Sequence, residues 1–147
     1  MLIGIPRILS PELLKVLMEM GHSDEIVLAD ANFPAASVAQ RLIRCDGHPI
    51  PELLEAILQL MPLDTYTVSP AAVMEVVPGD SVETSIWQRY QDLMAQQLGA
   101  TPSFESLERF AFYERARKAY AVIATGESAQ YANLILKKGI IRAQTDK

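Results

Sequence analysis

The sequence predicts an α/β domain whose helices cover a parallel sheet, and three observations support this prediction. Residues 26–28 are apolar without alternation, which is typical of a strand buried on both faces, as in parallel sheets. Residues 50–61 repeat apolar side chains at helical spacing, which indicates an amphipathic helix. The length of 147 residues suits one domain, residues 1–147, with a substantial core.

Composition and charge exclude several classes of protein. Apolar residues make up 50% of the chain and charged residues 21%, which is typical of a globular protein and not of a disordered one. The net charge of -5 argues against nucleic acid as a partner. Cys45 is the one cysteine, so no internal disulfide can form, and we interpret it as a small buried hydrophobe in a reducing compartment.

No membrane or export signal is recognisable in the sequence. The amino terminus lacks a basic region ahead of a long apolar stretch, so no signal peptide is expected. No apolar run approaches the roughly 20 residues that a membrane-spanning helix needs. We therefore expect a soluble cytoplasmic protein without a membrane partner.

The first helix and the strand after it have clear boundary signals. Ser10 can cap the helix and Pro11 suits its first position. Gly21 is expected to end the helix in the left-handed conformation. The further expected elements are an irregular segment at 35–45, a helix at 50–61 closed by Pro62, extended segments at 65–68 and 72–77, a helix at 85–98, a short helix from about 110, and strands at 120–125 and 134–136.

Asp30 and His22 flank the predicted buried strand. Asp30 follows the strand, and the carboxyl ends of strands are where open α/β sheets bind their ligands. His22 lies on the loop that enters the strand, so one subunit is expected to hold the two side chains apart. The alternative interpretation is that Asp30 is only a turn residue at the end of the strand.

Three aromatic and polar residues allow two interpretations each. Tyr131 and Asn133 are two apart in a segment expected to be extended, so their side chains point to the same face. A phenol and a carboxamide there suit a polyhydroxylated ligand such as a sugar, and the alternative is that they satisfy local backbone groups. Trp87 could stack on a sugar, but on an amphipathic helix we favour a core or subunit contact.

Motifs for cofactors, metals and hydrolases are absent from the sequence. There is no glycine-rich phosphate loop and no paired cysteines. His22, His48 and Cys45 do not make a standard zinc site by themselves. No Gly-x-Ser-x-Gly elbow supports a serine hydrolase. We therefore expect neither a metal nor an organic cofactor.

Eight segments of the chain carry a family resemblance: residues 10–17, 20–22, 24–27, 29–34, 43–47, 109–116, 125–127 and 131–139. In these segments the sequence resembles the family of L-fucose mutarotase and D-ribose pyranase. The matching segments keep the same order and spacing over nearly the whole chain, and the block Arg-Phe-Ala-Phe-Tyr-Glu-Arg resembles the fucose branch in particular. Residues 77–108 match poorly, and Ser23 and Ala132 stand where glycine is common.

The resemblance implies a three-layer α/β/α subunit with a mostly parallel sheet, assembled into a ring-shaped homo-oligomer, typically a decamer. It implies sites at subunit interfaces, so that His22 and Asp30 can meet although one chain separates them. By position in the motifs, His22 corresponds to the catalytic histidine. The residues that correspond to sugar-binding positions are Asp30, Arg109, Tyr131 and Asn133, and Tyr113 lies in the matching aromatic block.

The function implied by the resemblance is an isomerase of fucose metabolism that interconverts the α and β anomers of L-fucose. Anomer exchange needs ring opening and closing, and a histidine can supply the general acid–base catalysis. One alternative is pyran–furan interconversion of D-ribose, which the block beginning at Arg109 makes less favoured because it resembles the fucose branch. The other is a non-catalytic sugar-binding or transport-accessory ring. His22 argues against it, because such a ring needs no acid–base group.

Overall fold

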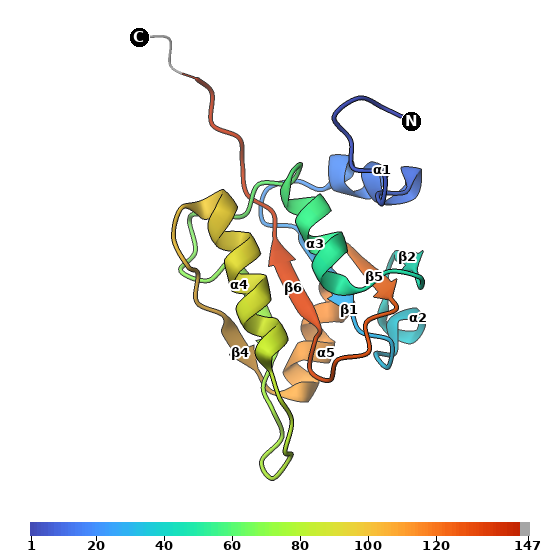
Figure 1. Cartoon of the computed structure of the whole chain (residues 1–147), viewed down its shortest axis with the longest axis vertical. Coiled ribbons are helices and arrows are strands. Elements are labelled where there is room, and N and C mark those ends of the chain that lie inside the picture. Colours follow the sequence, from blue (N-terminus) through green and yellow to red (C-terminus); the bar gives the residue numbers. More distant parts are fainter. Residues whose placement is uncertain (145–147) are drawn as a thin grey trace.

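The computed structural model of this protein describes residues 1–144, and its helices and strands alternate along the chain as far as β5, which β6 follows directly (Figure 1). The strands are β1 (Glu25–Ala29), β2 (Leu42–Cys45), β3 (Ala71–Met74), β4 (Glu105–Leu107), β5 (Ala121–Thr125) and β6 (Leu134–Lys137). The helices are α1 (Pro11–Glu19), α2 (Ala35–Val38), α3 (Ile50–Leu58), α4 (Ser85–Leu98) and α5 (Arg109–Lys118).

The six strands form one sheet in the order β2-β5-β1-β6-β3-β4. The β1–β5, β2–β5 and β3–β4 pairs are parallel, whereas β6 is antiparallel to both of its neighbours, β1 and β3. The sheet is therefore mostly parallel, with one strand of opposite direction in its interior.

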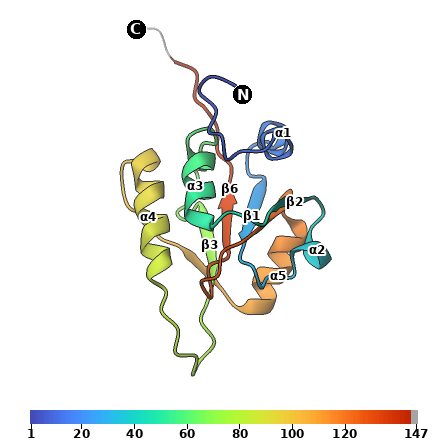
Figure 2. The same cartoon turned by 45° about the vertical axis from the view of Figure 1, so that its right-hand side comes forward.

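Helices cover both faces of the sheet, because side chains of its central strands alternate between two apolar cores. In β1, Ile26 and Leu28 pack in a core that includes side chains of α1, α3 and α4. Val27 and Ala29 pack in a second core with side chains of α2 and α5. Figure 2 shows α3 and α4 on one side of the sheet and α2 and α5 on the other. The buried central strand and the three layers are as expected.

The start of α1 agrees with the sequence-based expectation, but its end does not. Ser10 caps the helix, since its hydroxyl accepts a hydrogen bond from the Leu13 N–H at 3.1 Å. The left-handed residue is Ser23, with φ of 73°, and not Gly21. The Ser23 N–H donates to the carbonyl of Lys138 at 2.9 Å, so a contact with the end of β6 decides where this loop turns.

Further expectations were wrong at segments with weak apolar patterning. Residues 35–45, expected to be irregular, hold α2 and β2. Residues 65–68 form no strand, and Tyr66 and Val68 there are 66% and 91% exposed. Strand β4 was not expected because Glu105–Leu107 is short and largely polar, as suits an edge strand. Helix α4 matches its predicted bounds, and Gly99 ends it in the left-handed conformation with φ of 77°. Cys45 is buried, as expected.

Gly126 follows β5, and we predict that it tolerates no side chain. A Cβ atom at this position would overlap with the backbone carbonyl oxygen of Asp46, whereas a Cβ at Gly47 would meet open space. Gly126→Ala is therefore expected to lower the free energy of unfolding by about 1–3 kcal/mol through overpacking. Urea unfolding measures the loss, and Gly47→Ala is the matched control. Equal losses in the two variants would contradict the prediction.

Candidate active site

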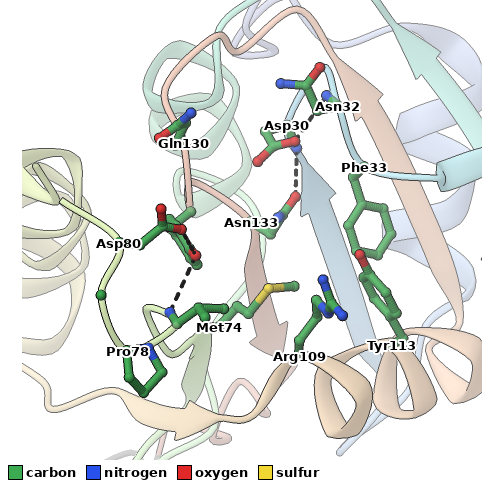
Figure 3. Close-up of a pocket in the computed structure, with 13 residues that line it drawn as sticks. Asp30, Asn32, Phe33, Met74, Pro78, Asp80, Arg109, Tyr113, Gln130 and Asn133 are labelled. Carbon is green, nitrogen blue, oxygen red and sulfur yellow. Dashed lines mark hydrogen bonds between the residues drawn. The ribbon is translucent and has the colours of Figure 1, made fainter. Parts of the chain in front are cut away.

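A cavity of about 600 Å³ opens at the carboxyl edge of the sheet, beside the ends of β1 and β3 (Figure 3). Because β6 runs antiparallel between these two strands, its first residues lie at the same edge. Open α/β sheets bind ligands at this edge of their strands. Five residues singled out from the sequence line the cavity together: Asp30, Arg109, Tyr113, Tyr131 and Asn133.

Asp30 directly follows β1 and lines this cavity, and a backbone N–H holds its carboxylate in place. The Asn32 N–H donates to Asp30 Oδ1 at 3.0 Å, and the Asp30 N–H donates to Asn133 Oδ1 at 2.8 Å. Burial raises the pKa of Asp30 above its ordinary value, although hydrogen bonds, including the one from Asn32, act in the opposite direction. A buried carboxylate of this kind is suited to accept hydrogen bonds from ligand hydroxyl groups.

The segment from Tyr131 to Asn133 is not extended, although both side chains face the cavity as expected. Tyr131 is left-handed, with φ of 56°. Side chains of α4 fix this conformation, because Trp87 Nε1 donates to the Tyr131 carbonyl at 2.8 Å and the Tyr90 hydroxyl donates to the Ala132 carbonyl at 2.8 Å. Trp87 packs against the core and does not line the cavity, so it acts on Tyr131 only through the hydrogen bond to its carbonyl.

Asp80 is a cavity residue that the sequence analysis missed. The Tyr131 hydroxyl donates to the Asp80 carboxylate and accepts from the Val77 N–H at 3.2 Å. The hydrogen bond to Asp80 raises the pKa of Tyr131. Pro78, Gly79 and Asp80 have the composition of a turn, which gave no reason to expect a residue of the site. Figure 3 shows Asp80 across the cavity from Asp30 and Asn32.

Arg109 brings a positive charge to the cavity from the first position of α5. The positive end of the helix dipole disfavours a cation there, although the Glu108 carboxylate caps the same helix end. Within the part of the chain that the structure describes, Arg109 forms no ion pair. Its guanidinium lies 4.8 Å from the centre of the Phe110 ring, which leaves its hydrogen-bond donors available to a ligand.

Aromatic rings form one wall of the cavity. The rings of Phe33 and Tyr113 meet edge to face with their centres 5.4 Å apart. In Figure 3 Arg109 lies between this pair and Met74. Tyr113 is thus a cavity residue, as its place in the aromatic block of the sequence indicated.

His22 does not join these residues within one chain. It precedes β1, whereas Asp30 follows it, and the five residues of the strand alone span roughly 16 Å. His22 Nε2 lies 3.1 Å from Oδ1 of Asp64, and its ring lies 5.4 Å from that of Tyr66, measured between centres. Asp64 had no signal in the sequence, because its partner is 42 residues away.

Among residues 1–144, no three histidine, cysteine, aspartate or glutamate side chains are grouped so as to hold a metal ion. In the same part of the chain, no helix is long and apolar enough to cross a membrane.

Comparisons with known proteins match nearly the whole chain. The model of the RbsD / FucU transport protein family matches residues 3–141. The chain is 56% identical to the fucose mutarotase of Homo sapiens over 144 residues, covering 94% of this chain and 93% of the relative. It is 52% identical to the L-fucose mutarotase of Actinobacillus pleuropneumoniae serotype 5b (strain L20) over 140 residues, covering 95% and 97%.

A solved structure shares both the fold and much of the sequence. It is the crystal structure of the fucose mutarotase from Streptococcus pneumoniae in complex with L-fucose. The TM-score is 0.91 and the sequence identity 55%, and the match covers 96% of this chain and 100% of that chain.

Asp80→Asn is predicted to lower the pKa of Tyr131 toward the ordinary value for tyrosine. The amide carries no negative charge, so ionisation of the phenol is no longer opposed by Asp80. A pH titration of tyrosinate absorbance measures the change, with the corresponding Tyr131→Phe variant identifying the contribution of Tyr131. Asp92→Asn, an exposed substitution on α4, is the control. An unchanged Tyr131 titration in the Asp80 variant would show that the two groups do not interact.

Proposed function

This chain belongs to the RbsD / FucU transport protein family, and we propose that it is an isomerase that interconverts the α and β anomers of L-fucose. The observation that carries the proposal is the close similarity, over nearly the full chain, to proteins named fucose mutarotase, one of them solved with L-fucose bound. The cavity adds a reason from chemistry, because its carboxylates, guanidinium, phenols and amides suit a small polyhydroxylated ligand.

Each of the five cavity residues that the sequence singled out has a proposed task in holding the sugar. Asp30 accepts hydrogen bonds from sugar hydroxyl groups, and Arg109 donates to sugar oxygens. Both are charged groups, whose hydrogen bonds are stronger than those between neutral partners. Asn133 and Tyr131 fix the orientation of the ring. Because the Tyr131 hydroxyl proton already points to Asp80, Tyr131 offers the sugar an acceptor. Tyr113 supplies an aromatic surface.

The proposed reaction needs proton transfers and no redox step. The bond between the anomeric carbon and the ring oxygen breaks, the resulting aldehyde rotates, and the ring closes on its other face. During opening, the ring oxygen gains a proton and the anomeric hydroxyl loses one, and closure reverses both transfers. We assign His22 as the general acid–base group, since an imidazole can both give and take a proton near neutral pH.

The distance between His22 and the cavity leads us to propose that a neighbouring subunit completes each site. A ring-shaped homo-oligomer, a decamer by resemblance, would bring His22 of one copy to the cavity of the next. Apolar surface at the His22 end of the subunit supports this proposal. Met18 and Ile141, 84% and 83% exposed, line one apolar groove, and the exposed Tyr66 packs against His22. Large exposed apolar patches are typical of subunit interfaces.

We further propose that the protein works in the cytoplasm as a single-domain subunit. The single, buried Cys45 is consistent with a reducing compartment. All six strands belong to one sheet, which is consistent with one domain.

The first prediction from this function is faster anomer exchange of L-fucose by the purified protein, without added metal and with chelator present. Saturation-transfer proton NMR measures the exchange, with D-ribose and other sugars run in parallel. His22→Ala is expected to slow exchange by roughly 10²–10⁴-fold, because the proton-transfer group is lost while most sugar contacts remain.

The same variants allow calorimetry to separate binding from chemistry. Asp30→Ala and Arg109→Ala are expected to weaken fucose binding first, whereas His22→Ala weakens it only modestly. Exchange no faster than in buffer would favour a non-catalytic sugar-binding ring. Greater acceleration with D-ribose than with L-fucose would favour the pyranase alternative.

The second prediction concerns the shared site. At low fucose concentration, His22→Ala subunits lack the proton-transfer group and Asp30→Ala subunits bind little sugar, so both are expected to show little activity. They are expected to regain activity when they are unfolded together and refolded as mixed rings. Random mixing of equal amounts gives about a quarter of the interfaces an intact His22 and an intact Asp30. Light scattering confirms assembly and NMR measures exchange. Inactive mixed rings, or a fully active monomer, would contradict the interfacial site.

A further inference from the structure

Asp64 is a buried carboxylate outside the cavity, and it contacts the proposed catalytic histidine directly. Its side chain is 5% exposed and its Oδ1 lies 3.1 Å from His22 Nε2. The same oxygen accepts a hydrogen bond from the Tyr66 N–H at 3.1 Å. The imidazole itself is 41% exposed, so its remaining edge faces outward from the subunit.

The end of β6 holds both partners of this contact in place. The Asp64 N–H donates to the Lys137 carbonyl at 3.0 Å, and the Ser23 N–H, next to His22, donates to the Lys138 carbonyl at 2.9 Å. A Cβ atom at Gly139 would collide with the backbone at Leu63 and Asp64. This close backbone packing leaves the Asp64 segment little freedom to shift.

The protonation of Asp64 determines which imidazole nitrogen carries the hydrogen of the contact. Burial alone would raise the pKa of Asp64, but hydrogen bonds from the Tyr66 N–H and from His22, together with the charge of Lys137, outweigh burial and lower it. An ionised carboxylate only accepts hydrogen bonds, so Nε2 of His22 must be the donor. A neutral imidazole carries one N–H, which leaves the lone pair of Nδ1 free.

We infer that Asp64 is a positioning residue for the reaction: it holds the imidazole of His22 so that Nδ1 is the nitrogen that exchanges protons with the sugar. The inference rests on the proposed function and adds which atom acts and what orients it. Carboxylates that bind the far nitrogen of a functional histidine fix its tautomer and ring orientation in many sites. Tyr66 contributes through the contact of its ring with the same imidazole, with 5.4 Å between the ring centres.

Nδ1 of His22 and water exchange all the protons that this step moves. Nδ1 takes the proton of the anomeric hydroxyl while the bond between the anomeric carbon and the ring oxygen breaks, and the ring oxygen takes a proton from water. After rotation of the aldehyde, the ring oxygen attacks the carbonyl carbon and releases its proton to water. The carbonyl oxygen recovers a proton from the imidazolium. Between the uptake and the return of this proton, the nearby Asp64 carboxylate stabilises the positive charge of the His22 imidazolium.

The test uses the wild-type protein and Asp64→Asn, which keeps the size of the side chain and removes its charge. An amide can donate to Nε2, so the variant is expected to shift neutral His22 toward the tautomer that carries its hydrogen on Nδ1. Exchange between the fucose anomers is expected to slow by roughly 10–100-fold, the loss typical when a carboxylate that orients a metal-bound histidine is changed. Fucose affinity by calorimetry is expected to stay unchanged, because Asp64 does not line the cavity.

The tautomer is read by ¹⁵N NMR of histidine-labelled protein, in which His22→Ala identifies the signals of His22 against those of His48. Asp46 is an exposed aspartate paired with Arg44, and Asp46→Asn is the charge-matched control. This substitution is expected to change neither the tautomer of His22 nor the rate of anomer exchange. Light scattering and thermal unfolding establish that each variant assembles and folds.

The outcomes separate this inference from the proposed function. Wild-type His22 with its hydrogen on Nδ1 overturns the inference whatever the activity and whether or not the variant folds. A folded Asp64→Asn protein with a wild-type rate, or with a rate loss fully explained by weaker fucose binding, overturns it as well. If the wild type does not accelerate fucose exchange, the proposed function fails by itself, and the positioning role in that reaction fails with it.

Discussion

The antiparallel strand β6 between β1 and β3 is the constraint on which the rest of the structure depends. Its amino end brings Asn133 beside Asp30, and the Asn133 carboxamide bonds the backbone at the end of β1. Its carboxyl end carries the carbonyls that hold the His22 loop and Asp64. One strand thus supports the cavity at one edge of the sheet and the histidine at the other. A parallel strand in this place would exchange these two ends.

Under the proposed function, the separation of His22 from the cavity gives the assembly of subunits a role in the chemistry. A rigid sheet keeps His22 and Asp30 apart in every isolated subunit, so no local motion of a loop can unite them. Under the proposed function, the subunit interface becomes part of the active site, and the apolar surface around Tyr66 serves catalysis as well as association. The isolated subunit then resembles a sugar-binding protein, and only the assembly acts as an enzyme. The non-catalytic alternative and the isomerase would differ by this one contact.

The sequence predicted the parts of the molecule that depend on local patterning. The buried strand β1, the helix α4 and the cap at Ser10 follow from apolar spacing and boundary residues, and the cavity residues it named do lie together. It failed where partners distant in sequence decide the conformation. The turn at Ser23 is set by a bond to β6, and Asp80 and Asp64 gain their meaning only from a tyrosine and a histidine far along the chain. The order of β6 within the sheet had no local signal at all.

Three residues that break local rules line the cavity, which supports a functional site independently of any family likeness. Tyr131 adopts a left-handed conformation that costs a non-glycine residue of order 1 kcal/mol or more. Arg109 places a cation at the positive end of a helix, and Asp30 is a carboxylate whose pKa burial raises. Each feature lowers stability when no ligand is bound, and a polyhydroxylated ligand can offset the last two with its hydroxyl groups. Such exceptions persist where binding needs them, and here all three line one cavity.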